Sequence, residues 1–288
     1  MQRQWHAFSV IEQGLEFRSF IGDGEFDALG NDCLLLFNIS SKQASVSQTL
    51  CELSLSEQNI LQLQCAIGAY SIRCCGHGLL AAAKYLLTEV QNSHTNRISI
   101  YMNGSQVDAY LENAENLERV VGVEHTESVA GLESARVWLV FAPLELRAVS
   151  MPIELAEQYA AYPYNAVSEA EGSQGYCLIE WQEDVDISAL AIPLLDASSQ
   201  CQQAIIFTKR ICENIIAMRY FAPQYGVSED VATGSSARVV TAYYRKPEIR
   251  IQQYSSSGGL LFGRFKPTAI EVGGYCEKAL EQESKDDQ

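Results

Sequence analysis

The stretch Cys75-Gly76-His77-Gly78-Leu79-Leu80-Ala81-Ala82-Ala83 decides the fold of this chain. From His77 to Val90, apolar residues cover nearly every side of a helix. A helix that is apolar all round has to be enclosed by other elements, because none of its faces suits water. The stretch therefore predicts a central helix wrapped by strands, with a glycine turn at its N-terminus.

A second small-residue turn, Thr233-Gly234-Ser235-Ser236, opens another largely apolar helix that Pro247 ends. The first N–H groups of a helix have no partner inside it, and the helix dipole places about half a positive charge there. Each turn is thus a potential site for a carboxylate or a reaction oxyanion. Glycine and serine are also common caps, so a purely structural role of either turn stays open. Two such turns facing one cleft would hold a carbanion or enolate beside its own carboxylate.

Strand patterns surround both helices. Leu61, Leu63 and Cys65 alternate with two glutamines within Ile60–Cys65, which predicts a half-buried strand. Asn103-Gly104 predicts a hairpin turn between two strands. Further strands and one helix are predicted from the same patterns: strands at Arg97–Met102, Gln106–Leu111, Val137–Ala142, Cys177–Trp181 and Ala204–Thr208, and a helix at Ile153–Ala161.

Length and charge narrow the class of protein. At 288 residues, two domains are expected, and the charged stretch Glu115–Val123 predicts the boundary, giving residues 1–118 and 119–288. The formal charge of −16 disfavours nucleic acid and anionic lipid as partners. No apolar run is long enough for a signal peptide or a spanning helix. We therefore expect a cytoplasmic protein without membrane contact.

The sequence offers no pattern for a cofactor or a metal. The nine cysteines include no Cys-x-x-Cys pair, which argues against a zinc ribbon and favours reduced thiols. The four histidines are scattered, and neither a dinucleotide-binding nor a P-loop glycine motif occurs. We expect neither metal nor cofactor.

Several segments carry a resemblance to a known family. The stretch around Cys75 resembles the CGHxxLAAA segment of the phenazine-biosynthesis (PhzF-like) isomerases. Phe221-Ala222-Pro223 with the segment Gly226–Ser235 resembles that family's FAP…GxxEDPxTGSA segment. The shorter matches are Gly30-Asn31, Leu55-Ser56-Glu57 and Val272-Gly273-Gly274, and all matches follow the family's order.

The resemblance implies the α+β fold of the diaminopimelate epimerases. In that fold two pseudo-symmetric domains each wrap a curved, mostly antiparallel sheet round one central helix, and the helix N-termini meet at the cleft. It also implies a cofactor-free isomerase, commonly homodimeric, that moves a proton between carbons of a small carboxylate-bearing substrate. The last residues of the chain either return to the first domain or form a frayed tail.

The resemblance assigns the general acid/base to Glu57. Burial in a cleft would raise the pKa of this carboxyl group toward neutrality, as proton transfer at carbon requires. An alternative from spacing is a capping box, in which Ser54 begins a helix and Glu57 closes it.

The other implied site residues lie at the two turns. His77 and Asp230 would orient the substrate and relay protons, and Ser235 would donate to the substrate carboxylate. Backbone N–H groups of Gly76, Gly78, Gly234 and Ser236 would donate with it. Cys75 suggests a two-base epimerase, but the matching position holds Thr233, whose hydroxyl is too weak an acid, so we expect Cys75 to be mainly a packing residue.

Departures from the family pattern leave a second function open. The family's FTP segment is absent, and Gln253–Gly259 replaces its GRP segment. The chain is therefore also compatible with a non-catalytic carboxylate-binding protein of the same fold.

Overall fold

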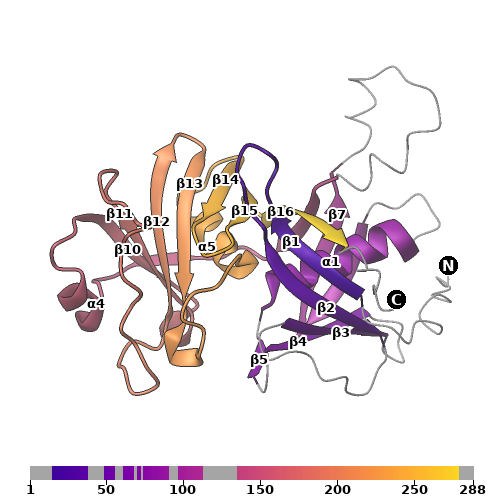
Figure 1. The fold of residues 1–288 in the computed structure, drawn as a ribbon, viewed down its shortest axis with the longest axis horizontal. Helices are drawn as coiled ribbons and strands as arrows, with labels where there is room; N and C mark the ends of the chain where they lie inside the picture. The colour runs from indigo at the N-terminus through magenta and orange to yellow at the C-terminus, as the bar shows by residue number, and fades with distance from the viewer. Residues whose placement is uncertain are drawn as a thin grey trace, which may run out of the picture.

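The structure is a computed structural model, and it describes residues 15–37, 49–55, 61–67, 70–72, 74–90, 97–112 and 135–278. These residues form two lobes, each of which holds one long helix against curved strands (Figure 1). The predicted boundary at 118/119 lies outside the described residues and stays a prediction. Within the described part of the chain, no helix is both long and apolar enough to cross a membrane.

The N-terminal lobe contains the helix that the first stretch predicts. α1 spans Gly76–Tyr85, all ten of its residues are buried, and a π-helical turn, Leu86–Val90, follows it. The strands around α1 are β1 (Leu15–Ile21), β2 (Asn31–Phe37), β3 (Thr49–Leu55), β4 (Leu61–Ile67), β5 (Tyr70–Ile72), β6 (Arg97–Met102), β7 (Ser105–Leu111) and β8 (Val137–Phe141). The expected enclosure of this helix is confirmed.

The C-terminal lobe repeats the arrangement around α5, Gly234–Tyr244. A short helix, α4, spans Ile153–Gln158 and ends three residues before the predicted bound. The lobe's strands are β9 (Leu146–Ala148), β10 (Tyr164–Ala170), β11 (Tyr176–Trp181), β12 (Ala204–Cys212), β13 (Ile215–Phe221), β14 (Ile249–Gln253), β15 (Gly259–Lys266) and β16 (Ala269–Lys278). Two 3-10 turns complete it, Gly172–Gln174 and Pro223–Tyr225.

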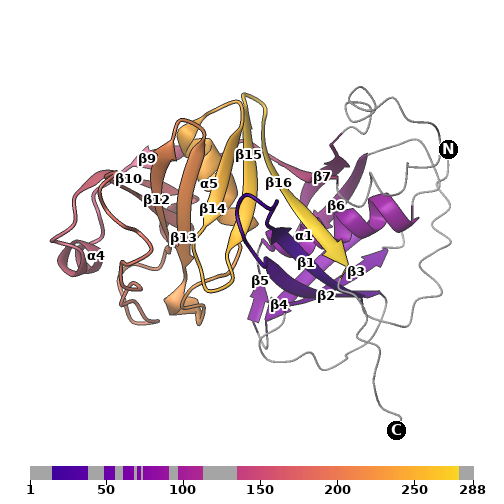
Figure 2. The ribbon, with the colours of Figure 1, turned by 45° about the horizontal axis from the view of Figure 1, so that its top comes forward.

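The strands follow one continuous path of hydrogen-bonded neighbours from β1 to β9. β16 joins the lobes, because it pairs with β15 of the C-terminal lobe and with β1 of the N-terminal lobe (Figure 2), and it pairs with β8 as well. The C-terminal strand thus returns to the first lobe, while residues 279–288 lie outside the described part. Most pairs are antiparallel, and the parallel ones are β2–β3, β4–β6, β11–β12 and β13–β14.

Two local predictions show why the sequence folds this way. Leu61, Leu63 and Cys65 in β4 are buried, while Gln62 and Gln64 are exposed, as the alternation requires. Asn103 and Gly104 both have positive φ, 48° and 79°, and join β6 to β7 in a two-residue hairpin.

Candidate functional site

The N-termini of the two central helices meet at the junction of the lobes. A Cβ atom added to Gly76 would stand 2.5 Å from the Gly234 Cα, so only glycine allows the two backbones to come this close. The residues before these glycines share one extended conformation: Cys75 has φ −106° and ψ 92°, and Thr233 has φ −116° and ψ 98°. Neither side chain caps its helix. The predicted meeting of the two helix N-termini is therefore present. We call them the first mouth (Cys75–Gly78) and the second mouth (Thr233–Ser236).

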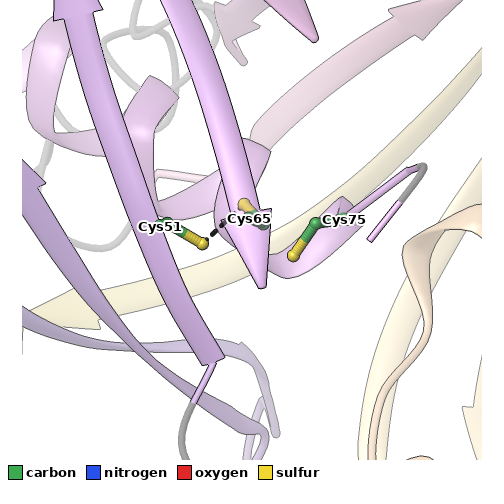
Figure 3. Close-up of side chains that lie close together, drawn as sticks. All are labelled: Cys51, Cys65 and Cys75. Carbon is green, nitrogen blue, oxygen red and sulfur yellow. Dashed lines mark hydrogen bonds between the residues drawn. The ribbon is translucent and has the colours of Figure 1, made fainter. Parts of the chain in front are cut away.

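Sulfur surrounds the first mouth. Cys75 is 2% exposed, and its Sγ lies within 4.8 Å of the Sγ atoms of Cys51 and Cys65 (Figure 3). Nε2 of His77 is 3.5 Å from the Cys75 Sγ. The Cys75 N–H donates to the Met102 sulfur at 3.4 Å, which fixes the start of the helix against β6.

These neighbours change the acidity of the Cys75 thiol. Burial raises its pKa, but hydrogen bonds from Cys51 and Cys65 and the positive charge of His77 outweigh burial. The pKa of Cys75 therefore lies well below its ordinary value. Cys75 packs as expected, but it also has the surroundings of a thiolate, which the sequence did not predict.

A half-buried carboxyl group, that of Asp230, lies beside the second mouth. Oδ2 of Asp230 accepts a hydrogen bond of 2.6 Å from the Thr233 hydroxyl, and Oδ1 accepts one from the Val231 N–H. Burial raises the pKa of Asp230, although His77 and the Thr233 hydroxyl partly offset the rise. Gln253 fixes this arrangement: its Oε1 accepts from the Thr233 N–H at 2.7 Å, and its Nε2 donates to the Asp230 carbonyl.

Asn31 connects the two mouths from the first strand after the Gly30 turn. Its Nδ2 donates to Asp230 Oδ1 at 3.1 Å and lies 3.4 Å from Nδ1 of His77. Gly30 has φ +75°, and a Cβ there would stand 2.5 Å from the Ser19 carbonyl oxygen, so glycine is needed to present Asn31. The structure thus brings His77 and Asp230, predicted from separate halves of the chain, into one polar cluster.

The two serines of the second mouth are buried. The Ser236 hydroxyl donates to the Thr233 carbonyl at 2.9 Å, a contact inside the mouth. Ser235 is 4% exposed and lies in hydrogen-bond range of the Tyr176 hydroxyl. Burial raises the pKa of Tyr176 to about 12, so this phenol stays neutral at the helix N-terminus. Gly78 lies over the three sulfurs, and a Cβ there would stand 2.4 Å from the Cys51 Sγ.

Glu57 lies outside the described residues. β6 runs toward the first mouth, where it ends with Met102, and β4 is parallel to β6. β3 is antiparallel to β4 and so runs away from the mouth. Cys51 lies at the mouth, and Leu55 ends β3 four residues later, about 13 Å farther along an extended strand. Leu55, the last described residue before Glu57, therefore lies farther from the mouths than Cys51 does.

The capping-box alternative for Glu57 is wrong. Ser54 lies inside β3 and pairs with Gln62 of β4, and Leu55 is still in the strand. A residue in a ladder cannot be the N-cap of a helix that would begin at the next position.

A cavity of about 610 Å³ lies next to Gln253. Gln253 belongs both to its wall and to the hydrogen bonds of Thr233. The remaining wall comes from both lobes: Phe26, Asp27, Leu29, Asp186, Ser188 and Tyr254–Gly258. The segment Gln253–Gly259, singled out as a departure from the family pattern, thus frames this cavity.

The sequence of this region matches a known family. Residues 69–259, about two thirds of the chain, match the sequence profile described as "Phenazine biosynthesis-like protein". This chain belongs to the phenazine biosynthesis-like family. The matched segment includes both mouths, Asp230 and Gln253, and it begins after Glu57.

Curated relatives agree with this membership. The chain is 25% identical over 209 residues to an uncharacterized isomerase of Pseudomonas aeruginosa, covering 71% of this chain and 70% of that protein. It is 23% identical over 217 residues to phenazine biosynthesis-like domain-containing protein 1 of Mus musculus, covering 72% of this chain and 71% of that protein.

Solved structures show the same fold. A phenazine biosynthesis protein of the PhzF family from Enterococcus faecalis matches 93% of this chain and 98% of its own, with a TM-score of 0.66 at 14% identity. A hydroxyproline epimerase from Agrobacterium vitis matches 93% of this chain and 92% of its own, with a TM-score of 0.55 at 6% identity. The expected α+β fold is confirmed for this family member.

Proposed function

We propose that this protein is a cofactor-free isomerase or epimerase that moves a proton at a carbon atom next to a carboxylate. The observation that carries the proposal is the meeting of two buried helix N-termini, each with its own titratable group. The N–H groups of the two mouths would hold the substrate carboxylate and the negative charge that develops on it. Relatives named as isomerases and epimerases support this reaction class.

The two mouths offer one base and one acid. The Cys75 thiol has a lowered pKa, whereas the Asp230 carboxyl has a raised one. Pairs of groups whose surroundings push their pKa values apart are typical of acid and base partners. The Cys75 thiolate would remove the proton from carbon, and protonated Asp230 would return one to the carbanion. His77 would stabilise the negative charge of the Cys75 thiolate while Cys75 and Asp230 exchange protons with the substrate.

Glu57 is the alternative acid/base, proposed from the family resemblance alone. Among the described residues, Asp230 is the carboxyl group that lies within the cluster of His77, Asn31 and Thr233.

The 610 Å³ cavity suggests the substrate class. It adjoins the second mouth through Gln253, and its wall carries two carboxyl groups, Asp27 and Asp186. Negative charge there favours a cationic group on the substrate. We infer that the substrate is a small amino acid, with its carboxylate toward the mouths and its ammonium group toward the cavity.

Solvent-proton exchange tests the proposal. The full chain is incubated in D2O with a panel of small amino acids and hydroxy acids, and deuterium at the α-carbon is measured by mass spectrometry. We expect incorporation by the native protein and a loss of about 100-fold or more in Cys75→Ala and in Asp230→Asn, since general acid–base groups contribute that much. Incorporation that both variants retain would contradict the assigned roles.

A non-catalytic carboxylate-binding protein is the second candidate. It is favoured by the departure from the family pattern at Gln253–Gly259, because residues of that segment line the cavity beside Thr233. Thermal stabilisation by a carboxylate without any deuterium incorporation would decide for this candidate. A cytoplasmic homodimer remains the expected state, to be checked by fractionation and by sedimentation.

A further inference from the structure

The three thiols at the first mouth form a cluster that the proposed proton transfer does not require as a group. Cys51 and Cys65 are directly opposite each other in the β3–β4 ladder, and Cys75 precedes α1. The exposed fractions of the three side chains are 0%, 3% and 2%. All three sulfurs lie within 4.8 Å of one another, with Cys51 and Cys65 at 2.7 Å (Figure 3).

Gly78 keeps the space beside these sulfurs free. The point where a Cβ of Gly78 would stand is 2.4, 2.8 and 3.0 Å from the sulfurs of Cys51, Cys65 and Cys75. Bonds from zinc to thiolate sulfur are about 2.3 Å long. The three sulfurs therefore converge on one point at close to the zinc–sulfur distance. An ion would lie near this point, on the side that faces away from the backbone of Gly78.

We propose that Cys51, Cys65 and Cys75 bind one zinc ion, with His77 beside the fourth coordination position. Three cysteines and one histidine are a common zinc ligand set, and thiolates favour zinc over the hard cations. His77 lies beside the cluster, with its Nε2 3.5 Å from the Cys75 Sγ, and would have to move closer to the other two sulfurs to complete the set.

The geometry requires only small side-chain movements. Tetrahedral coordination places ligand sulfurs about 3.8 Å apart, so the Cys51 and Cys65 sulfurs must separate by roughly 1 Å. A rotation about each Cα–Cβ bond supplies this movement without shifting the strands. The ligands come from two paired strands and the start of a buried helix, elements rigid enough to hold a metal. Sequence spacing missed the site because the cysteines are separated by 13 and 9 residues and meet only through the β3–β4 pairing.

Zinc binding also has a consequence for the proposed function, on which this second part of the inference rests. A zinc ion would occupy the sulfur of Cys75 and engage His77, so the first mouth would lose its base. Zinc would then inhibit proton exchange, and a chelator would restore it.

The test is zinc binding by the full chain, independent of any activity. The protein is reduced, freed of metal with a chelator, and titrated with zinc against a chromophoric chelator, and cobalt serves as a second probe through its thiolate charge-transfer band. We expect one zinc per chain. Cys51→Ser and Cys65→Ser should each weaken binding by more than 100-fold, because loss of a ligand exceeds the 10–100-fold effect of an outer partner.

Two controls keep the outcome decisive. Cys177→Ala removes a buried cysteine of the other lobe and should retain full affinity. Gly78→Ala keeps all three thiols, but its methyl group would press on the three sulfurs and force them out of their converging arrangement, so it should lose zinc while circular dichroism shows a folded chain. Absence of zinc binding by the reduced native protein, or retention of affinity by Cys51→Ser, would overturn the proposal. One further outcome would also overturn the proposal. If the peptides of Cys51 and Cys65 were together two daltons lighter before reduction, and the reduced protein bound no zinc, the two cysteines would form a disulfide instead.

Discussion

The two helix mouths have the same backbone and opposite chemistry. The φ and ψ angles of Cys75 and Thr233 agree within about 10°, and the glycines that follow them touch. The first mouth, however, carries a thiol among thiols, and the second a hydroxyl that donates to Asp230. Backbone symmetry thus provides two equivalent anion-binding helix ends, while the side chains divide the work between a base and an acid.

The largest effect is expected from separating the mouths. A methyl group in Gly76→Ala would stand 2.5 Å from the Gly234 Cα, and backbone cannot yield as a side chain does. We expect a loss of about 3 kcal/mol in the free energy of unfolding, at the upper end of overpacking costs. The measurement is urea denaturation followed by circular dichroism.

Gly24→Ala is the matched control for this substitution. Gly24 has φ +89° and no atom within 4 Å of its added Cβ, so the change costs only the conformational term of about 1 kcal/mol. If Gly76→Ala destabilised the protein no more than this control, the close contact of the mouths would be wrong.

A smaller effect is expected from removing the hydroxyl of the second mouth. Thr233→Val keeps the shape but deprives Asp230 of its 2.6 Å donor and Gln253 of an acceptor. We expect a loss of about 2 kcal/mol, because buried polar groups are left without partners. Thr233→Ser should recover most of the loss in the same urea titration, and a full loss in the serine variant would point to packing instead.

The pH dependence of stability distinguishes the two mouths further. Because burial raises the folded-state pKa of Asp230, its contribution to stability is fully present below the unfolded-state pKa near 4 and is lost as the pH rises through the folded-state value. Asp230→Asn removes this titration. Measured between pH 4 and 8, the native chain should lose stability relative to Asp230→Asn as the pH rises. If the difference in the free energy of unfolding between the two proteins did not change with pH, the pKa of Asp230 would not be raised in the folded protein.

The smallest effect is expected from Glu57→Gln. If proton transfer belongs to the mouths, the rate of deuterium exchange should stay within about twofold of the native rate, against 100-fold losses at general acid–base residues. The exchange assay on matched protein preparations checks this. A loss as large as that of Asp230→Asn would return the acid/base role to Glu57.

Local patterns predicted most of the fold. The enclosed helix after Cys75, the Asn103-Gly104 hairpin and the alternation in β4 all follow from residue order alone, because each depends on neighbours a few positions apart. His77 and Asp230 were found through family motifs, and the structure brings them together through Asn31.

The features that the sequence did not reveal all depend on distant pairing. Cys51 and Cys65 meet through strand register, and Gln253 reaches Thr233 from a strand 20 positions later. The direction of β3 likewise follows from its pairing with β4 and not from any local motif. In the sequence, the sign of the thiol cluster is that Cys65 takes a buried position in the alternating pattern of β4. Any apolar residue could take that position, so the pattern does not point to a cluster of thiols.

The central claim is that the two helix mouths act as one anion site, and amide NMR tests it most directly. Uniformly 15N-labelled protein is titrated with succinate, and uncharged succinamide serves as the control ligand. The account predicts that the amide resonances of Gly78 and Ser236 both shift, with a single dissociation constant, and that succinamide leaves them in place. Shifts at one mouth only, or equal shifts with succinamide, would contradict the account.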